Sequence, residues 1–187
     1  AQHSVETALE QLIPHTVLKD AFERNLTSIN KPPAEILQRG SGWGALERLR
    51  RHAAREEPFC SEALIFDEES LQSQQEPWLH LLREGAFPAQ PAAEAVNAAM
   101  VQIQWYKQLE DSVTSAAGDN WTAWLNLGVM RHYAGDSDGA RRAWQRSLAH
   151  KETAWAARNL AILAMEDGKQ NKAVELLDVA YRHMPNL

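Results

Sequence analysis

The chain contains 187 residues with a mass of 21.0 kDa, and its 19 Lys and Arg against 25 Asp and Glu give a formal net charge of −6. This charge disfavours nucleic acids and anionic membranes as partners, because both attract a clustered positive field. The single cysteine, Cys60, excludes an internal disulfide framework and a multi-cysteine metal site.

The sequence shows neither a membrane span nor a targeting segment. No stretch approaches the roughly 20 apolar residues that cross a bilayer, and residues 1–10 lack the basic start and apolar run of a signal peptide. A cytoplasmic location is therefore expected. The first residue is Ala1 and not methionine, which is typical of a processed protein or of a part of a longer one.

Residues 1–66 are predicted to form an irregular helical region. Apolar residues recur at helical spacing over 5–13 and 17–26, and the prolines at 32–33 mark a break. A glycine-rich bend at 40–44 then precedes a basic helix. Residues 63–66 (ALIF) are the only segment that resembles a strand, so the sequence predicts an all-α protein.

The basic helix carries Arg48, Arg50, Arg51 and Arg55, flanked by the acidic residues 47, 56 and 57. Pairing of these arginines with the neighbouring glutamates is the expected arrangement, and a docking patch for an acidic partner is the alternative. The G-x-G-x-G pattern at 40–44 follows no strand and precedes no Lys-Ser/Thr pair, so it indicates a turn and not a phosphate loop.

Residues 67–77 (DEESLQSQQEP) are the most polar stretch and are expected to be an exposed linker. Residues 78–118 are predicted to contain capping helices. The first is a short helix over 78–83, ended by Gly85, and the second lies between 91 and 115. The apolar residues of the second fall near helical spacing, and they are Val96, Met100, Ile103, Trp105 and Leu109.

Residues 119–187 repeat themselves with an offset of 33 residues. Asn126-Leu127 recurs as Asn159-Leu160, Gly135 as Gly168, and Ala140 as Ala173. Each unit is predicted to be two short helices. The first pair runs from a cap at 119–120 to about 133 and from 136–138 to about 150. The second runs from 153 to 168 and from about 171 to 185. Small residues at 140 and 173 let paired helices approach closely, while residues 124, 127, 144 and 148 fill the seam.

These units resemble the tetratricopeptide repeat (TPR). Trp124, Leu127 and Gly128 match its W-x2-L-G pattern, Ala140 and Trp144 its A-x3-aromatic element, and Pro185 its closing proline. The second unit departs from the pattern at 157 and 161, where alanine replaces Trp and Gly. The resemblance implies an α-solenoid of TPR-type hairpins over 119–187, with the upstream helices acting as an irregular cap because two repeats cannot bury their own faces.

In this family the inner helices line a concave groove that binds extended peptides. By register, the positions that face it are Thr122, Leu125, Val129, His132, Tyr133, Trp155, Arg158, Ile162, Met165 and Glu166. Packing against the chain's own upstream domain and capture of a separate peptide are both compatible with an apolar inner face. Tyr133 and Trp155 are the expected anchors, because rigid aromatic side chains dominate interface energetics.

A wider resemblance covers most of residues 36–184. The order of GSGWGALERLRR, PWLHLLREGAFP and WLNLGVMRHYAGD is similar to the carboxy-terminal region of large bacterial proteins of uncharacterised function. Their amino-terminal part looks like a galactose-mutarotase-type β-sandwich. The resemblance implies that this chain is the helical tail of a larger carbohydrate-active or carbohydrate-binding protein. It also implies that no sugar-site residue lies within the chain.

No residue pattern predicts catalysis, a cofactor or a metal. The seven histidines have no ligand spacing, and Asp136-Ser137-Asp138-Gly139 lacks the later acidic residue of a calcium loop. Cys60 has no adjacent base, and Asn120 in a glycosylation triplet is better explained as a helix cap. The sequence thus predicts a non-enzymatic scaffold whose partner is a protein, with homodimers through exposed helical faces as a possibility. The alternative is a free-standing peptide-binding adaptor.

Overall fold

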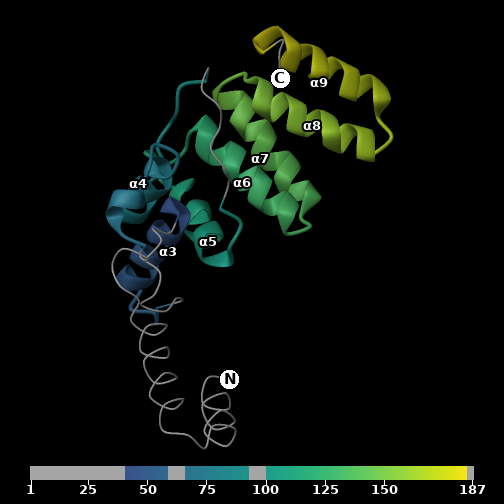
Figure 1. Ribbon diagram of the computed structural model, residues 1–187. Coiled ribbons are helices and arrows are strands. Elements are labelled where there is room, and N and C mark those ends of the chain that lie inside the picture. The colour runs from purple at the N-terminus through teal and green to yellow at the C-terminus, as the bar shows by residue number, and fades with distance from the viewer. Residues whose placement is uncertain (1–40, 59–65, 93–99, 185–187) are drawn as a thin grey trace, which may run out of the picture. The chain divides into compact units, whose positions relative to one another are not determined.

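The computed structural model describes residues 41–58, 66–92 and 100–184 (Figure 1). Within these ranges the chain forms seven α-helices and one 3-10 helix and contains no strand, which confirms the all-α prediction for this part of the chain. The predictions for residues 5–13, 17–26 and Cys60, and for most of the strand-like segment at 63–66, lie outside the described residues. Contacts divide the chain into two units, Ala1–Leu71 and Gln72–Leu187.

In the first unit, helix α3 spans Gly42–Ala53 and begins after Ser41, whose Oγ accepts a hydrogen bond from the Gly44 amide. The expected glycine-rich turn before residue 45 is therefore wrong, because the helix already includes Gly44. A Cβ atom at Gly44 would lie 2.2 Å from the ring of Phe66. Glycine is needed there for close approach and not for a turn.

The arginines of α3 are paired. Arg50 is buried, and its guanidinium lies 2.8 Å from Glu47 and 2.6 Å from Glu56, while Arg51 lies 2.9 Å from Glu47. The hydrogen bonds that Arg50 donates to Glu56 and then to Glu47 raise its pKa above the usual range. Arg48 donates a hydrogen bond to the Phe66 carbonyl. The predicted pairing with neighbouring glutamates is thus confirmed for Arg50 and Arg51.

The segment expected to be an exposed linker, residues 67–77, is partly ordered into helix. A 3-10 helix, η2, spans Glu68–Ser70, and α4 spans Glu76–Glu84. Gln75 is buried, so the expectation of an exposed linker is wrong at its carboxy-terminal end. The boundary between the two units still falls within this segment, after Leu71.

The second unit begins with α4 and with α5, which spans Ile103–Ser112. As predicted, α4 ends at Gly85, which has a φ of +70°. Trp78 of α4 packs edge-to-face against Trp105 of α5, with ring centroids 5.9 Å apart. Ile103 was expected on this apolar face but is 56% exposed. It is two residues before Trp105, about 200° away around the helix, so burial of Trp105 turns it outward.

The carboxy-terminal part of the second unit forms two antiparallel helix pairs (Figure 1). Their bounds lie close to the predicted ones: α6 Trp121–Tyr133, α7 Ser137–His150, α8 Ala154–Glu166 and α9 Gln170–His183. Asn120 caps α6 and Asp136 caps α7, each accepting backbone N–H hydrogen bonds with its side chain. Gly135 and Gly168 connect the helices of each pair with φ values of +83° and +72°.

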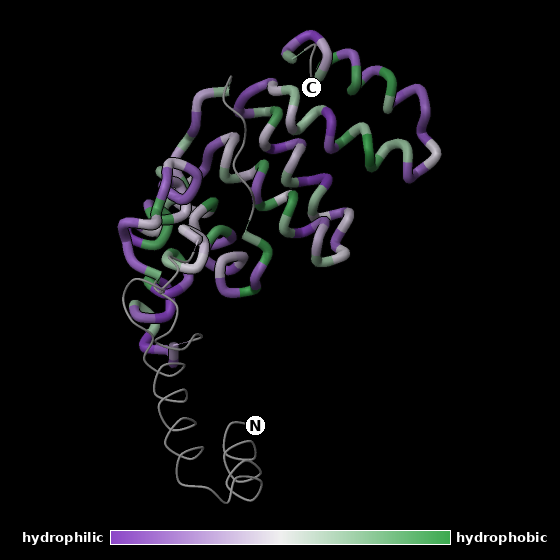
Figure 2. The backbone as a smooth tube through the Cα atoms, in the orientation of Figure 1, coloured by the Kyte–Doolittle hydropathy of each residue, from purple (hydrophilic) through white to green (hydrophobic). Residues whose placement is uncertain are grey.

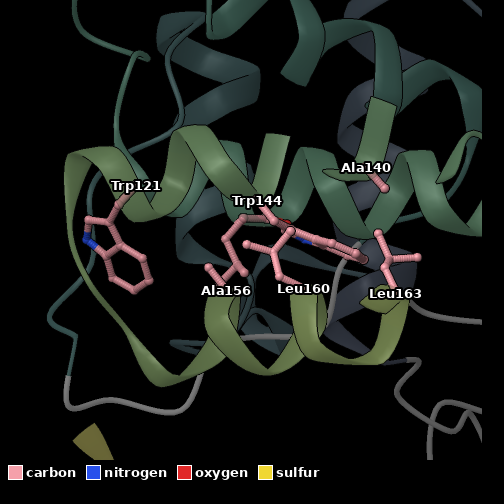
Figure 3. Packing of buried hydrophobic residues seen from close by; sticks show 7 residues of the cluster. Trp121, Ala140, Trp144, Ala156, Leu160 and Leu163 are labelled. Atoms are coloured by element: carbon pink, nitrogen blue, oxygen red, sulfur yellow. The ribbon is translucent and has the colours of Figure 1, made fainter. Parts of the chain in front are cut away.

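One core joins the two pairs. Its buried residues come from α6, α7 and α8: Trp121, Leu125, Ala140, Trp144, Ala156, Leu160 and Leu163 (Figure 3). Ala140 and Ala173 are buried as predicted. Trp124, expected to fill the seam, is only partly buried, and its Nε1 donates to Asp119 Oδ1 at 2.6 Å. In Figure 2, hydrophobic and hydrophilic positions alternate along all four helices.

The 33-residue repeat also appears in the contacts. His150 Nε2 lies 2.9 Å from Asp119 Oδ1, and His183 Nε2 lies 2.8 Å from Glu152 Oε1, at positions 33 residues later. The hydrogen bond from Trp124, followed by that from His150, lowers the pKa of Asp119. The hydrogen bond from His183 lowers the pKa of Glu152. Each pair ties the residues before the first helix of a unit to the end of its second helix.

Candidate functional site

The ten residues expected to line the groove occupy five equivalent positions on α6 and α8. Of the four positions near the amino-terminal ends of these helices, Thr122, Leu125 and Trp155 are wholly or partly buried, whereas Arg158 is exposed. Positions at the carboxy-terminal ends are exposed, as at Tyr133 and Met165. The predicted groove positions are thus covered at the start of α6 and exposed at Arg158 and at the carboxy-terminal ends of both helices.

Thr122 and Leu125 are buried by the chain itself. The Thr122 hydroxyl accepts a hydrogen bond from the Gln90 amide at 2.9 Å, and Leu125 belongs to the core that contains Trp144. At these two positions the groove predicted from register is therefore filled by the chain and is not open to a separate peptide. Sequence register placed them on the inner face of a helix, but it did not show that residues 86–92 cover this end.

Residues 86–92 carry no helix between Phe87 and Pro91 and are held through their backbone. Four side chains of the region from α5 to α6 bond to this backbone. Ser112 Oγ accepts from the Phe87 amide, Asn120 Nδ2 donates to the Phe87 carbonyl, Thr122 Oγ1 accepts from the Gln90 amide, and Trp121 Nε1 donates to the Gln90 carbonyl, at 2.7–3.1 Å. Asn120 is therefore fully engaged as a cap and as a donor, which agrees with its interpretation as a cap.

The exposed members of this set are here called the candidate surface, and they are His132, Tyr133, Arg158, Met165 and Glu166. Val129 and Ile162 are partly buried at the positions between them. The surface combines an aromatic ring, a thioether, a cation and an anion. The His132 ring contacts the Trp144 ring, with centroids 5.7 Å apart, which links this surface to the core.

Trp155, one of the two expected anchors, is mainly a packing residue. Its side chain is partly buried against the core. Its Nε1 is buried and, within the described residues, has no hydrogen-bond partner. Tyr133 is the reverse case, because 72% of its surface is exposed. Of the two expected anchors, only Tyr133 has a largely exposed side chain.

In the part of the chain that the structure describes, no group of three or more His, Cys, Asp or Glu residues is placed to hold a metal ion. None of the helices seen in these ranges has the length and apolar content to cross a bilayer. In the first unit an open hollow of about 380 Å³ lies between α3 and residues 66–68, lined in part by Arg48, His52 and Asp67.

Comparison of the chain with protein-family models, with curated proteins and with solved structures finds no match. The assignment of a role therefore rests on the geometry of the chain itself. Two features of that geometry have no local sequence signal: the cover provided by residues 86–92 and the exposure of the apolar face of α9. Both depend on which distant segments meet.

Proposed function

We propose that the chain is a non-catalytic docking module of the tetratricopeptide type. In this proposal it is the helical tail of a larger, carbohydrate-related bacterial protein, and it holds protein segments of that polypeptide or of a partner. The 33-residue offset supports the repeat assignment, because it recurs in the sequence, the glycine turns and the histidine–carboxylate pairs.

The observation that carries this proposal is the way residues 86–92 are held. Side chains near the start of α6 bond to main-chain N–H and C=O groups of Phe87 and Gln90. Such bonds recognise an unpaired backbone and depend little on the side chains that it carries. The start of α6 thus already holds one non-helical segment of the same chain, residues 86–92. This favours a role in holding protein segments.

The candidate surface is the proposed contact for the partner. Tyr133 and Arg158 are exposed there, and aromatic and arginine side chains are the residue types that most often dominate binding energy. Glu166 is at the position equivalent to Tyr133, 33 residues later. A partner segment of mixed polar and aromatic character fits this set better than a purely apolar or purely acidic one.

Photo-crosslinking in the native host tests the proposal. A photoreactive amino acid is placed at Tyr133 or Arg158, with Gln145 as a control that is also exposed but lies on α7, outside both proposed docking surfaces. We expect specific crosslinks to a protein segment from the first two positions, with a pattern that differs from the control. Equal, nonspecific labelling from all three positions would contradict a docking role for the candidate surface.

The native mass separates the two versions of the proposal. An antibody raised against this chain should detect a polypeptide well above 21.0 kDa if the chain is the tail of a larger protein. A band near that mass favours the second candidate, a free-standing peptide-binding adaptor, which the exposure of Tyr133 and Arg158 also supports.

For the adaptor, peptides selected on the full chain should lose binding with Arg158→Ala while the melting temperature is unchanged. Trp155→Ala should lower the melting temperature, because its ring packs against the core. If Arg158→Ala instead lowers the melting temperature and leaves peptide binding intact, the adaptor loses its support.

A further inference from the structure

Helix α9 exposes a continuous apolar face. Val174, Leu177 and Tyr181 are 66%, 42% and 64% exposed, and they are half of the large hydrophobic side chains that are exposed in the described residues. Spacings of three and four residues place them on one side of the helix. These three residues are called the α9 stripe.

The 33-residue register shows what covers the equivalent face one unit earlier. The positions equivalent to Leu177 and Tyr181 are Trp144 and Leu148 of α7. Trp144 is only 3% exposed, because α8 packs over it with Leu160 and Leu163 (Figure 3). The α9 stripe is therefore the α7–α8 interface repeated once more, with its second helix missing from the described residues.

We propose that the α9 stripe is a docking site for an α-helix of a protein partner, and that this helix carries the apolar pattern of α8. In α8 the face toward α7 has a small residue, Ala156, followed by Leu160 and Leu163 four and seven residues later. The same pattern allows a helix to approach α9 closely at one end and to cover it with leucines at the other. The site is separate from the candidate surface and does not depend on the function proposed for it.

The stripe itself argues against a second copy of α9 as the occupant. The core shared by α7 and α8 contains two fully buried alanines, Ala140 of α7 and Ala156 of α8. Helix α9 keeps the equivalent of the first, Ala173, which is buried, but the exposed stripe of Val, Leu and Tyr has no small residue of its own. Two α9 helices facing each other would place bulky side chains against bulky side chains and hold the helix axes apart. A partner that supplies the small residues fits better.

The charges beside the stripe set the rim of the site. Asp178 and Arg182 pair with each other at 3.2 Å on one flank of α9. Because this pair is already satisfied and exposed, it contributes little to affinity, and binding should vary only weakly with salt. Apolar burial by the stripe is then the main driving force.

The test uses the full chain, labelled with ¹⁵N, and a synthetic peptide with the sequence of residues 153–166, acetylated and amidated at its ends. We expect saturable shifts of α9 resonances with a dissociation constant at or below about 1 mM. Leu177→Gln and Tyr181→Ser should weaken binding about tenfold or more, a loss typical of anchor residues. A peptide of the same composition with its alanine and leucine positions scrambled should not bind.

Matched controls carry the same substitutions elsewhere. Met165→Gln and Tyr133→Ser alter side chains that are 51% and 72% exposed on the candidate surface, and they should leave peptide binding unchanged. This arrangement also separates the two proposals, since loss of crosslinking at the candidate surface leaves this titration unaffected. If Leu177→Gln impairs folding, as judged by circular dichroism, Tyr181→Ser decides the outcome.

Three results would overturn the inference. Absence of saturable shifts on α9 would show that an α8-like helix does not bind there. Shifts centred on Trp144 would show that the peptide replaces α8 and does not use the stripe. Concentration-dependent α9 shifts without peptide, removed by Leu177→Gln, would identify a second copy of the chain as the occupant.

Discussion

The contact between Gly128 and Trp144 gives the sharpest test of how the repeat units pack. A Cβ atom at Gly128 would lie 2.2 Å from Trp144 Nε1 and 2.4 Å from Cδ1. Ordinary contacts between nonbonded carbon atoms are about 3.5–4.0 Å, so Gly128→Ala would force the indole to move. Trp144 is enclosed by α8 and donates its Nε1 hydrogen to the Leu125 carbonyl at 3.1 Å. The movement therefore disturbs both the core and this hydrogen bond.

The expected cost follows from opposing effects. Overpacking a core costs about 1–3 kcal/mol, and weakening the hydrogen bond adds about 1 kcal/mol. Replacing a helical glycine by alanine raises the free energy of unfolding by about 1 kcal/mol through helix propensity. Gly128→Ala should therefore lower the free energy of unfolding by about 1–3 kcal/mol, although the same substitution in an open helix stabilises it.

The second unit suggests the compensating change. At the equivalent positions it has Ala161 and Leu177 in place of glycine and tryptophan. Trp144→Leu alone should be destabilising, because a large buried ring is lost. In the Trp144→Leu background, however, Gly128→Ala no longer meets the indole and should stabilise by about 0.5–1 kcal/mol. The coupling energy between the two sites is then about 1.5–4 kcal/mol.

Urea denaturation of the four chains, followed by far-UV circular dichroism, measures this coupling from the midpoints at constant m. Ala161→Gly is the control, with an expected loss of about 1 kcal/mol that is independent of residue 144. The packing argument would be refuted if Gly128→Ala lowered the free energy of unfolding equally in the wild-type and Trp144→Leu chains. It would also be refuted if Gly128→Ala stabilised the wild-type chain.

Three further predictions concern ion pairs and turns. The pKa values of Asp119 and Glu152 are lowered in the folded chain, so the stability they provide is present above their unfolded pKa values and is lost as the pH falls through about 4 and below. Acid titrations by circular dichroism should show a smaller loss in Asp119→Asn and Glu152→Gln than in wild type. Arg50→Ala should speed hydrogen exchange of α3 amides more than Arg51→Ala does. Arg50 is buried between two carboxylates, whereas the Arg51 side chain is 32% exposed. Gly135→Ala and Gly168→Ala should each cost about 1–2 kcal/mol in thermal denaturation, since both have positive φ. Asparagine should cost less than alanine at either position.

The sequence by itself determined the four helices of the repeat units to within a few residues, whereas α5 is much shorter than the 91–115 segment predicted for it. Asn120 and Asp136 mark helix starts, Gly85 and Gly135 mark helix ends, and each acts through atoms within a few residues of itself. The 33-residue offset predicted which helices are equivalent, because a repeated unit must bury the same positions each time. For this reason the alanines at the helix crossings were also predicted correctly.

Only the tertiary structure decided which of these surfaces are covered. Thr122 and Leu125 lie on the predicted face of α6, but a segment about 32 residues earlier and a helix of the same unit bury them. Gly44 was mistaken for a turn because its partner, Phe66, lies 22 residues away. Ile103 was placed in the core because periodicity defines an apolar face only to within a turn. Residue patterns report local preferences, whereas burial depends on contacts between distant segments, and these contacts leave Tyr133 and the α9 stripe open.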